Sequence, residues 1–322
     1  PIGAQREEGH FLLSFAGDCT LGSEEAKRKQ ATSFDSVITE KGYDWPFANM
    51  QELFQNDDLT VVNLEGVLSD SNKQENKKKT FRFRGPTDYV NILTRSGIEA
   101  VNLANNHTQD FGKQGFTSTQ QTLDAAGIGY FGGQTYYVWE KNGIKIAFFG
   151  MGSTGFNGNK KWAKEEIARL KRDEGVDAVV FTFHAGQEYG KHRLQRQVDF
   201  AQYVIDAGAD LVVGHHSHRI NPIEEYKGKY IVYSLGNFCF SGNKNPSDMS
   251  SFMFQMRWRV KDGVVTQDAW RIIPIRISSR TDYNDFTPTV LTKATSIDSL
   301  LLTLKENGKK LDNPVTEYPL EW

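Results

Sequence analysis

Five short apolar segments, far apart along the chain, each run into residues whose side chains commonly bind metal ions. The residues that follow these segments are Asp18, Glu65, Asn106 with His107, His184, and the histidine-rich stretch 215–218. Each group lies where a β-strand is expected to end, and open α/β sheets place their binding sites at the carboxyl ends of their strands. The pattern therefore predicts a sheet protein whose strand ends meet at one polar site.

The rest of the apolar pattern indicates alternating strands and helices over the first two thirds of the chain. Segments 59–64 and 98–103 are rich in β-forming residues, whereas 87–96 and 115–126 have helical spacing and are each followed by a glycine. Segment 251–277 alternates apolar and polar residues, which is typical of half-buried strands. This order predicts an α/β fold with a mixed sheet or two stacked sheets and with helices outside.

We expect a single domain over residues 1–277, with 278–322 as a C-terminal extension packed on the same domain. Two glycine-containing turns, 141–143 and 227–229, each lie between short β-forming segments and predict hairpins. A helix is expected over 299–306.

Composition sets limits on the class of protein. The chain has 322 residues, is 38% hydrophobic and 24% charged, and carries a formal net charge of -2, which argues against nucleic acid as its main partner. A chain of this length buries enough surface to fold without disulfides. Cys19 and Cys239 do not form a CxxC pair, so we expect two buried thiols, with a disulfide between them as the alternative.

The N-terminus bears on localisation. The sequence contains no run of 18 apolar residues, and it begins with Pro1 rather than Met. We therefore expect a targeting segment that precedes the given sequence, and an extracytoplasmic protein that this segment attaches to the membrane, as an anchored protein or a lipoprotein.

Asp18 and Glu65 are the carboxylates of the predicted site. Each follows an apolar segment, and each could instead be an ordinary turn or cap residue. Glu65 is followed by a glycine, and a carboxylate in this position can bridge two cations, since each of its oxygens can take one.

Asn106, His107 and Asp110 form the next group. An asparagine oxygen can ligate a hard cation, and the neighbouring His107 would then be available to donate a proton to a leaving oxygen. Asp110 lies three residues further and could orient that imidazole. A histidine that is simply hydrogen-bonded in the core is the alternative for His107.

The remaining histidines follow two other apolar segments. His184 comes directly after a buried segment, and Glu188 and Tyr189 could shape the same pocket. His216 and His218 are two residues apart, so in an extended segment both would face the same side. His215 is then expected to point away and to support the ligands from behind.

Taken together, these motifs resemble those of the bacterial capsule-synthesis protein family called CapA or PgsA, which is associated with poly-γ-glutamate capsules. The matching motifs are Gly-Asp at 17–18, Asn-Leu-Glu at 63–65, Phe-Arg-Gly-Pro at 83–86, Asn-Leu-Ala-Asn-Asn-His at 102–107, His-x-Gly-x-Glu-Tyr at 184–189, His-x-His at 216–218 and Tyr-Ser-Leu-Gly-Asn-Phe at 233–238. The resemblance covers roughly residues 11–240. That family is in turn similar to the calcineurin-like metallophosphoesterases, which implies a four-layer α/β/β/α sandwich.

The resemblance also implies roles for individual residues. Asp18 and His218 would bind a first metal, Glu65 would bridge, and Asn106, His184 and His216 would bind a second metal, with His107 as the acid for the leaving group. Two positions depart from the phosphoesterase pattern: Thr20 stands where a histidine is usual, and Glu65 where an aspartate is usual.

Two functions remain open from the sequence. The first is hydrolysis of a phosphoester or amide linkage, in a polymer or a phosphorylated small substrate, with two divalent cations (Mn, Fe or Zn) held by mixed oxygen and nitrogen ligands. Arg82 and Arg84 would then bind carboxylates or phosphates of the substrate. The second is a non-catalytic accessory protein that binds or guides an anionic polymer, with membrane-bound capsule synthesis components as partners. The basic cluster 73–79 is expected to be a solvated loop.

Overall fold

Two β-sheets packed face to face form the centre of the protein. The computed structural model describes residues 8–152, 159–191 and 195–322. The first sheet has the order β16 (Thr289–Val290), β15 (Val264–Arg276), β14 (Ser250–Lys261), β1 (Gly9–Thr20), β2 (Leu59–Leu64), β5 (Ala100–Asn102) and β6 (Gly129–Phe131), and β13 (Asn237–Phe240) also pairs with β1. The second sheet has the order β11 (Ile220–Tyr226), β12 (Lys229–Leu235), β10 (Leu211–His215), β9 (Ala178–His184), β8 (Ile144–Gly152) and β7 (Tyr137–Lys141).

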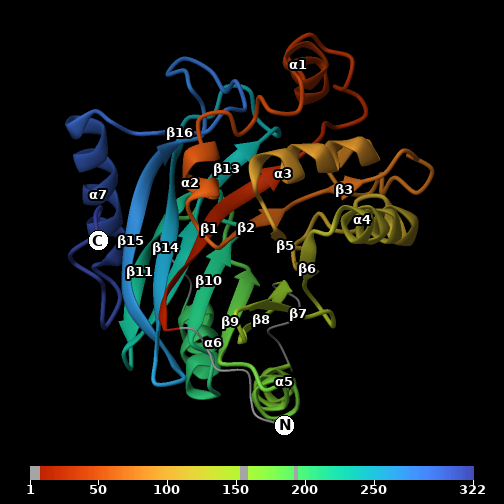
Figure 1. Ribbon diagram of the computed structural model, residues 1–322. Coiled ribbons are helices and arrows are strands. Elements are labelled where there is room, and N and C mark those ends of the chain that lie inside the picture. Colours follow the sequence, from red (N-terminus) through yellow and green to blue (C-terminus); the bar gives the residue numbers. More distant parts are fainter. Residues whose placement is uncertain (1–7, 153–158, 192–194) are drawn as a thin grey trace.

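Helices cover the outer faces of both sheets (Figure 1). The first sheet is covered by α1 (Phe34–Lys41), α2 (Gln51–Gln55), the short helix η1 (Thr87–Tyr89), α3 (Val90–Ser96) and α4 (Gly112–Ala126). The second sheet is covered by α5 (Lys160–Asp173) and α6 (Gln195–Asp206). The predicted four-layer α/β/β/α sandwich is therefore confirmed.

The central strands are apolar on both faces, which explains their continuous apolar runs in the sequence. Val61 of β2 contributes to the core between the sheets, whereas its neighbour Val62 packs against the helices. Phe148 and Phe149 of β8 divide in the same way between the inner core and the layer of α5 and α6. Burial on both faces fixes the register of these strands, because a slip of one residue would exchange the two sets of side chains.

Parallel pairing brings the ends of the central strands to one edge of the sandwich. Strands β1, β2 and β5 run parallel in the first sheet, and β8, β9, β10 and β12 run parallel in the second. Asp18 pairs with Asn63 across β1 and β2, and His184 pairs with His215 across β9 and β10. The polar residues at the strand ends are therefore neighbours in space.

The predicted turns and helix ends are confirmed. Asn142 and Gly143 have φ values of 50° and 75° in the turn between β7 and β8, and Lys227 and Gly228 have 52° and 72° between β11 and β12. Two consecutive residues with positive φ suit a tight hairpin turn. Gly97 and Gly127 adopt the left-handed conformation that ends α3 and α4.

Residues 278–322 pack on both sheets. β16 extends the first sheet, and α7 (Ala294–Gly308) lies beside β11 (Figure 1). Leu300 and Leu304 of this helix and Tyr318 contribute to the core between the sheets. The predicted helix over 299–306 is confirmed, although it begins five residues earlier.

Cys19 and Cys239 are both buried and are free thiols, as expected from the sequence. Within the described parts of the chain, no helix is both long and apolar enough to cross a membrane.

Glu99 should make the stability of the fold depend on pH. It lies directly before β5, at the edge of the first sheet opposite the carboxyl ends of the parallel strands. Burial, together with the charge of Asp57, raises the pKa of Glu99 to about 7. The folded protein therefore keeps a proton that the unfolded chain loses at lower pH, so this contribution to stability disappears as the pH rises through about 7. We expect Glu99→Gln to raise the free energy of unfolding by about 1–2 kcal/mol at about pH 8.5, after allowance for partial exposure, and by much less at about pH 5.

Urea unfolding at the two pH values measures this difference. Glutamine can keep the hydrogen bond that Glu99 Oε2 accepts from Thr60 N at 2.8 Å. The control is Glu140→Gln, since the Glu140 side chain is 58% exposed. Equal effects of the two substitutions at both pH values would contradict the prediction.

Candidate functional site

Three side chains from different strand ends meet in one buried cluster. Asp18 lies near the end of β1, Glu65 follows β2, and His218 follows β10. One ligand atom from each lies within 4.8 Å of the other two, and all three side chains are buried. We call Asp18, Glu65 and His218 the carboxylate cluster.

Two glycines allow the backbone to approach closely at this edge. A Cβ on Gly17 would lie 2.0 Å from the carbonyl oxygen of Gly236, and a Cβ on Gly214 would lie 2.3 Å from the carbonyl oxygen of Tyr233. Any larger residue at these positions would push β1 away from β13, or β10 away from β12. Gly17 and Gly214, which precede Asp18 and the histidine segment, are therefore packing requirements of the site.

Three further predicted ligands meet beside the carboxylate cluster. Asn106 Oδ1 lies 2.8 Å from His184 Nε2, and His216 Nδ1 lies 3.0 Å from the same nitrogen. We call Asn106, His184 and His216 the Asn–His cluster. His184 Nε2 also lies 3.7 Å from Glu65 Oε1, so the two groups adjoin at Glu65.

The histidine segment after β10 is not extended, and this corrects the sequence analysis. His216 has a φ of 101° and His218 a φ of 54°, values that are uncommon for residues other than glycine. The resulting turn directs His216 toward His184 and His218 toward Asp18. His215 was expected to point away, which is wrong: its Nδ1 lies 3.5 Å from Asp18 Oδ1.

The two carboxylates are buried close together and titrate in opposite directions. Burial disfavours the charge of Asp18, but the neighbouring imidazoles of His215 and His218 outweigh it and hold the pKa of Asp18 well below its usual value. Burial, followed by the charge of Asp18, raises the pKa of Glu65 well above its usual value. The site therefore concentrates negative charge that favours a proton or a cation beside Glu65.

The histidines respond to the same field. Burial alone would lower the pKa of His218, but its contact with Asp18 and the charge of Glu65 raise it to about 9. Burial lowers the pKa of His184 and of His216. These two imidazoles therefore favour the neutral form, which is the form that ligates metals.

Unpartnered oxygens show that the carboxylate cluster fits a cation. Asp18 Oδ2 and Glu65 Oε2 are buried and accept no hydrogen bond from any described residue. Buried polar atoms are nearly always hydrogen-bonded, so two orphan carboxylate oxygens without a hydrogen bond favour a positive partner. The His218 imidazole, 3.3 Å from Asp18 Oδ2, supplies part of that charge, and Glu65 Oε2 has no such neighbour within 3.5 Å among the described residues. Together with an imidazole, they form the mixed oxygen and nitrogen donor set that suits Mn, Fe or Zn.

His107 and Asp110 form a pair next to this cluster. His107 Nδ1 lies 2.7 Å from Asp110 Oδ2, which also accepts a hydrogen bond from Phe83 N at 2.8 Å. The opposite ring nitrogen, Nε2, lies 3.9 Å from Glu65 Oε2. The contact that the sequence predicted between His107 and Asp110 is therefore present, and it turns Nε2 toward the carboxylate cluster.

Lys79 is a site residue that sequence reasoning missed. Its ammonium group pairs with Asp110 Oδ1, donates to Asn106 O at 2.6 Å and lies 3.4 Å from His107 Nδ1. The sequence analysis expects Lys79 to lie in a solvated loop, and for this residue that expectation is wrong. No spacing rule indicates the pairing, because it depends on how the segment before β4 (Arg84–Gly85) folds back over residues 106–110.

Arg82 and Arg84 do not offer free guanidinium groups to a substrate. Arg82 binds Glu75 through Nε at 3.0 Å and Nη2 at 2.8 Å. Arg84 is buried, and its Nε donates to Glu25 Oε1 at 2.7 Å. The expectation that these two side chains bind an anionic substrate is not supported, because both guanidinium groups already hold the chain together.

Glu188 and Tyr189 lie at the rim of the site. Both are exposed, and Tyr189 has a φ of 61°. The centroid of the Tyr189 ring lies 6.1 Å from that of His218, and the Arg219 guanidinium stacks on the ring 5.0 Å from its centroid. Their predicted role in substrate binding remains a prediction.

Thr20 does not replace the histidine that phosphoesterases usually carry at its position. Its hydroxyl lies 2.8 Å from Ser241 Oγ, so it is part of a hydrogen bond with the segment after β13. The carboxylate cluster instead receives imidazoles from the β10 side through His215 and His218.

Asn63 and Asn237 are two further site residues that the sequence analysis assigned no role. Asn63 Nδ2 donates to Asp18 Oδ1 at 2.8 Å, and Asn237 Oδ1 lies 2.8 Å from His218 Nδ1. Asn63 precedes Glu65 by two residues, so the period of a strand could have placed it on the same side. Asn237 follows a glycine with positive φ, and its position depends on how β13 docks onto β1.

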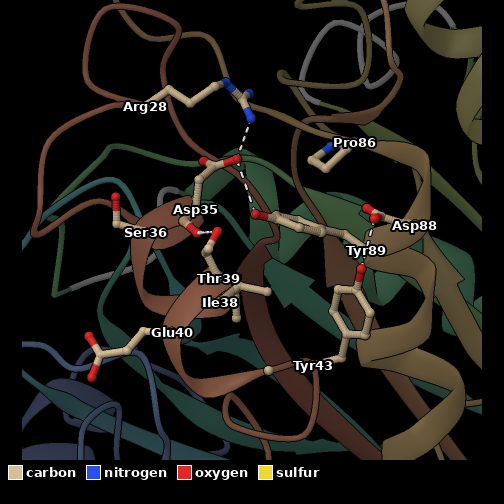
Figure 2. A pocket seen from close by; sticks show the side chains of 11 residues that line it. Arg28, Asp35, Ser36, Ile38, Thr39, Glu40, Tyr43, Pro86, Asp88 and Tyr89 are labelled. Carbon is tan, nitrogen blue, oxygen red and sulfur yellow. Dashed lines mark hydrogen bonds and ion pairs between the residues drawn. The ribbon is translucent and has the colours of Figure 1, made fainter.

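A cavity of about 830 Å³ lies elsewhere, between α1 and η1. Figure 2 shows Arg28 and the Tyr89 hydroxyl directed at Asp35, and the Tyr43 hydroxyl directed at Asp88. None of the predicted site residues lines this cavity, so its size does not bear on the chemistry of the carboxylate cluster.

Comparison with known families agrees with the motifs. A sequence profile described as "Bacterial capsule synthesis protein PGA_cap" matches residues 12–242. The chain is 33% identical over 246 residues to the "PGA biosynthesis protein CapA" of Bacillus subtilis (strain 168), which covers 70% of this chain and 62% of that protein. It is 26% identical over 277 residues to the "Capsule biosynthesis protein CapA" of Bacillus anthracis, covering 78% of this chain and 65% of that protein.

The chain thus spans a little under two thirds of the length of these two relatives. Among solved structures, a hypothetical protein from Thermus thermophilus has a similar fold, with a TM-score of 0.50 and 15% sequence identity. That similarity covers 82% of this chain and 98% of the other.

Lys79 should stabilise the fold through Asp110. The Lys79 side chain is 28% exposed, whereas Asp110 is fully buried, so removal of the ammonium group leaves a buried carboxylate with one donor fewer. We expect Lys79→Met to lower the free energy of unfolding by about 2 kcal/mol, less than for a fully buried pair because Lys79 is partly exposed. Urea unfolding measures the change, and Lys78→Met, at an exposed neighbour, is the control. Similar effects of both substitutions would show that the pair contributes little.

Proposed function

The chain belongs to the bacterial capsule synthesis protein family, and from that premise we propose that it is a metal-dependent hydrolase of capsule polymer production. The proposed substrates contain a phosphoester or an amide linkage, in an anionic polymer or a phosphorylated small molecule. The observation that carries this proposal is the pair of orphan oxygens on Asp18 and Glu65 with His107 Nε2 3.9 Å from one of them.

The proposed ligands divide between the two groups of the site. Asp18, Glu65 and His218 would hold a first divalent cation, and the Asn–His cluster would hold a second next to Glu65. Bound there, such cations would polarise the scissile linkage and lower the pKa of a water molecule. Manganese, iron and zinc suit this donor set.

The chain's own residues contribute orientation and a proton donor. Asp110 Oδ2 would accept a hydrogen bond from Nδ1–H of His107, which fixes the ring and directs Nε2 toward the reacting side. His107 would donate its Nε2 proton to the leaving oxygen or nitrogen. Lys79 holds Asp110 from the other side, so the pair keeps its orientation when substrate enters.

A His107→Gln variant tests hydrolysis. We expect the variant to bind Mn²⁺ as the wild type does but to hydrolyse diphenyl phosphate or a γ-glutamyl anilide about 100-fold more slowly, since these basic leaving groups need a proton and a positioned donor contributes about that factor. Product absorbance measures the rate in metal-loaded protein. His10→Gln is the control, because the His10 side chain is 49% exposed and contacts Asp268 instead. Turnover of neither probe by the wild type, or turnover unaffected at His107, would remove the hydrolase proposal.

Binding of an anionic polymer is the second proposed function, and the loop between Ser69 and Phe83 favours it. Lys73, Lys77 and Lys78 are exposed on this loop. The loop is fixed against the site, since Asn76 N donates to Asp110 O at 2.8 Å and Lys79 pairs with the Asp110 side chain. We call residues 70–82 the basic loop. Its exposed ammonium groups, rather than Arg82 and Arg84, would attract carboxylates of a polymer at the cell surface, where membrane-bound capsule synthesis components would be its partners.

Charge reversal on the basic loop tests polymer binding. We expect Lys77→Glu combined with Lys78→Glu to weaken binding of fluorescent poly-γ-glutamate about tenfold at low salt, with an unchanged melting temperature, because both side chains are exposed. Fluorescence anisotropy measures affinity. The control double variant, Lys161→Glu with Lys164→Glu on α5, changes the net charge equally on another helix layer. Equal weakening by both double variants would show only a general charge effect and would contradict a specific loop site.

A further inference from the structure

Asn63 lies against both carboxylates of the carboxylate cluster. It is fully buried, and its Nδ2 lies 2.8 Å from Asp18 Oδ1, 3.1 Å from Glu65 Oε1 and 3.2 Å from His184 Nδ1. One amide nitrogen therefore contacts three predicted ligands from three different strands.

The orientation of this amide is fixed by its other end. Asn63 Oδ1 accepts hydrogen bonds from Asn102 Nδ2 at 2.9 Å and from Asn105 Nδ2 at 3.2 Å. Reversal of the amide would place its oxygen against two carboxylates and its nitrogen against two donors. The nitrogen therefore faces the carboxylates, and the chain of three asparagines holds it there.

The hydrogen bonds of Asn63 explain which oxygen of each carboxylate has no hydrogen-bond partner. Asn63 holds Oδ1 of Asp18 and Oε1 of Glu65. The two orphan oxygens are the opposite ones, Oδ2 of Asp18 and Oε2 of Glu65. Asp18 Oδ2 lies 3.3 Å from His218 Nδ1, on the side of the third cluster member.

We propose that Asn63 is a positioning residue that presents one oxygen of each carboxylate to a cation and makes the two metal sites unequal. The carboxylate cluster then binds one divalent cation tightly through Asp18, Glu65 and His218. A second cation at the Asn–His cluster binds at least about tenfold more weakly. This inference rests on the metal site of the proposed function, but not on hydrolysis.

The second site is weaker because its atoms already satisfy one another. His184 Nε2 lies 2.8 Å from Asn106 Oδ1 and 3.0 Å from His216 Nδ1. Glu65 Oε1, the carboxylate oxygen 3.7 Å from His184 Nε2, is the one that Asn63 holds. A cation at this position would have to break these contacts. At the carboxylate cluster, Glu65 Oε2 gives up no hydrogen bond, and Asp18 Oδ2 exchanges its 3.3 Å contact with His218 Nδ1 for the cation.

Calorimetric titration of chelator-treated protein with Mn²⁺ tests the wild type directly. We expect one tightly bound ion per chain, followed by a second with a dissociation constant at least about ten times larger. Two equivalent ions per chain would overturn this inference and leave the proposed hydrolase intact. Absence of any binding, with Zn²⁺ as well as Mn²⁺, would overturn both.

Two Asn63 variants test the positioning role. Asn63→Leu keeps the volume but removes the amide, and Asn63→Ala avoids the branched side chain if the leucine variant does not fold. In either, we expect the dissociation constant of the first ion to rise at least about tenfold, because Asp18 and Glu65 lose the donor that orients them.

Asn307→Leu separates this effect from general destabilisation. Asn307 is a buried asparagine on α7 whose Nδ2 donates to Ile220 O at 3.5 Å. The control is expected to lower the melting temperature while leaving Mn²⁺ affinity unchanged. If the Asn63 variants retained wild-type affinity, or if Asn307→Leu weakened it equally, the positioning role of Asn63 would be ruled out.

Discussion

The burial of two carboxylates side by side is the constraint on which the rest of the site depends. Asp18 and Glu65 are both nearly inaccessible to solvent, and each raises the cost of a charge on the other. Such a pair is tolerated only where donors and positive groups surround it. Asn63 supplies the donor between the two carboxylates, and His215 and His218 supply imidazoles on the side of Asp18. The polar interior is thus organised around these two carboxyl groups.

The site exists only when the two sheets pack together. Asp18 and Glu65 come from the first sheet, and His184 and His218 come from the strand ends of the second. Phe15 of β1 and Phe148 of β8 pack in the core between them, with ring centroids 6.4 Å apart. The apolar core therefore sets the distance between the two halves of the site, and Gly17 and Gly214 allow close packing of the strands that carry Asp18 and the histidine segment. Folding energy and site geometry are coupled through the same interface.

The sequence predicts this site well where the backbone is regular. Asp18, Glu65 and His184 could be placed because each ends a continuous apolar strand, and parallel strands bring such ends to one edge. His215 could not, because the segment after β10 leaves the extended conformation at His216, and the alternation of faces then no longer applies. The sequence also misses that Lys79, Arg82 and Arg84 pair with carboxylates of the chain itself. Their partners Asp110, Glu75 and Glu25 are set by the path of an irregular loop, on which periodicity carries no information.

The basic loop links the two proposed functions physically. Lys79 pairs with Asp110, which in turn contacts His107, so this loop is held to the pair that is proposed to donate a proton. The exposed Lys77 and Lys78 directly precede Lys79 in the chain. An anionic polymer bound to those two side chains would therefore act on a segment that contacts Asp110, the partner of the proposed acid His107. The two proposed functions are in this sense not independent, because the segment whose exposed lysines would retain a polymer also carries Lys79, which pairs with Asp110.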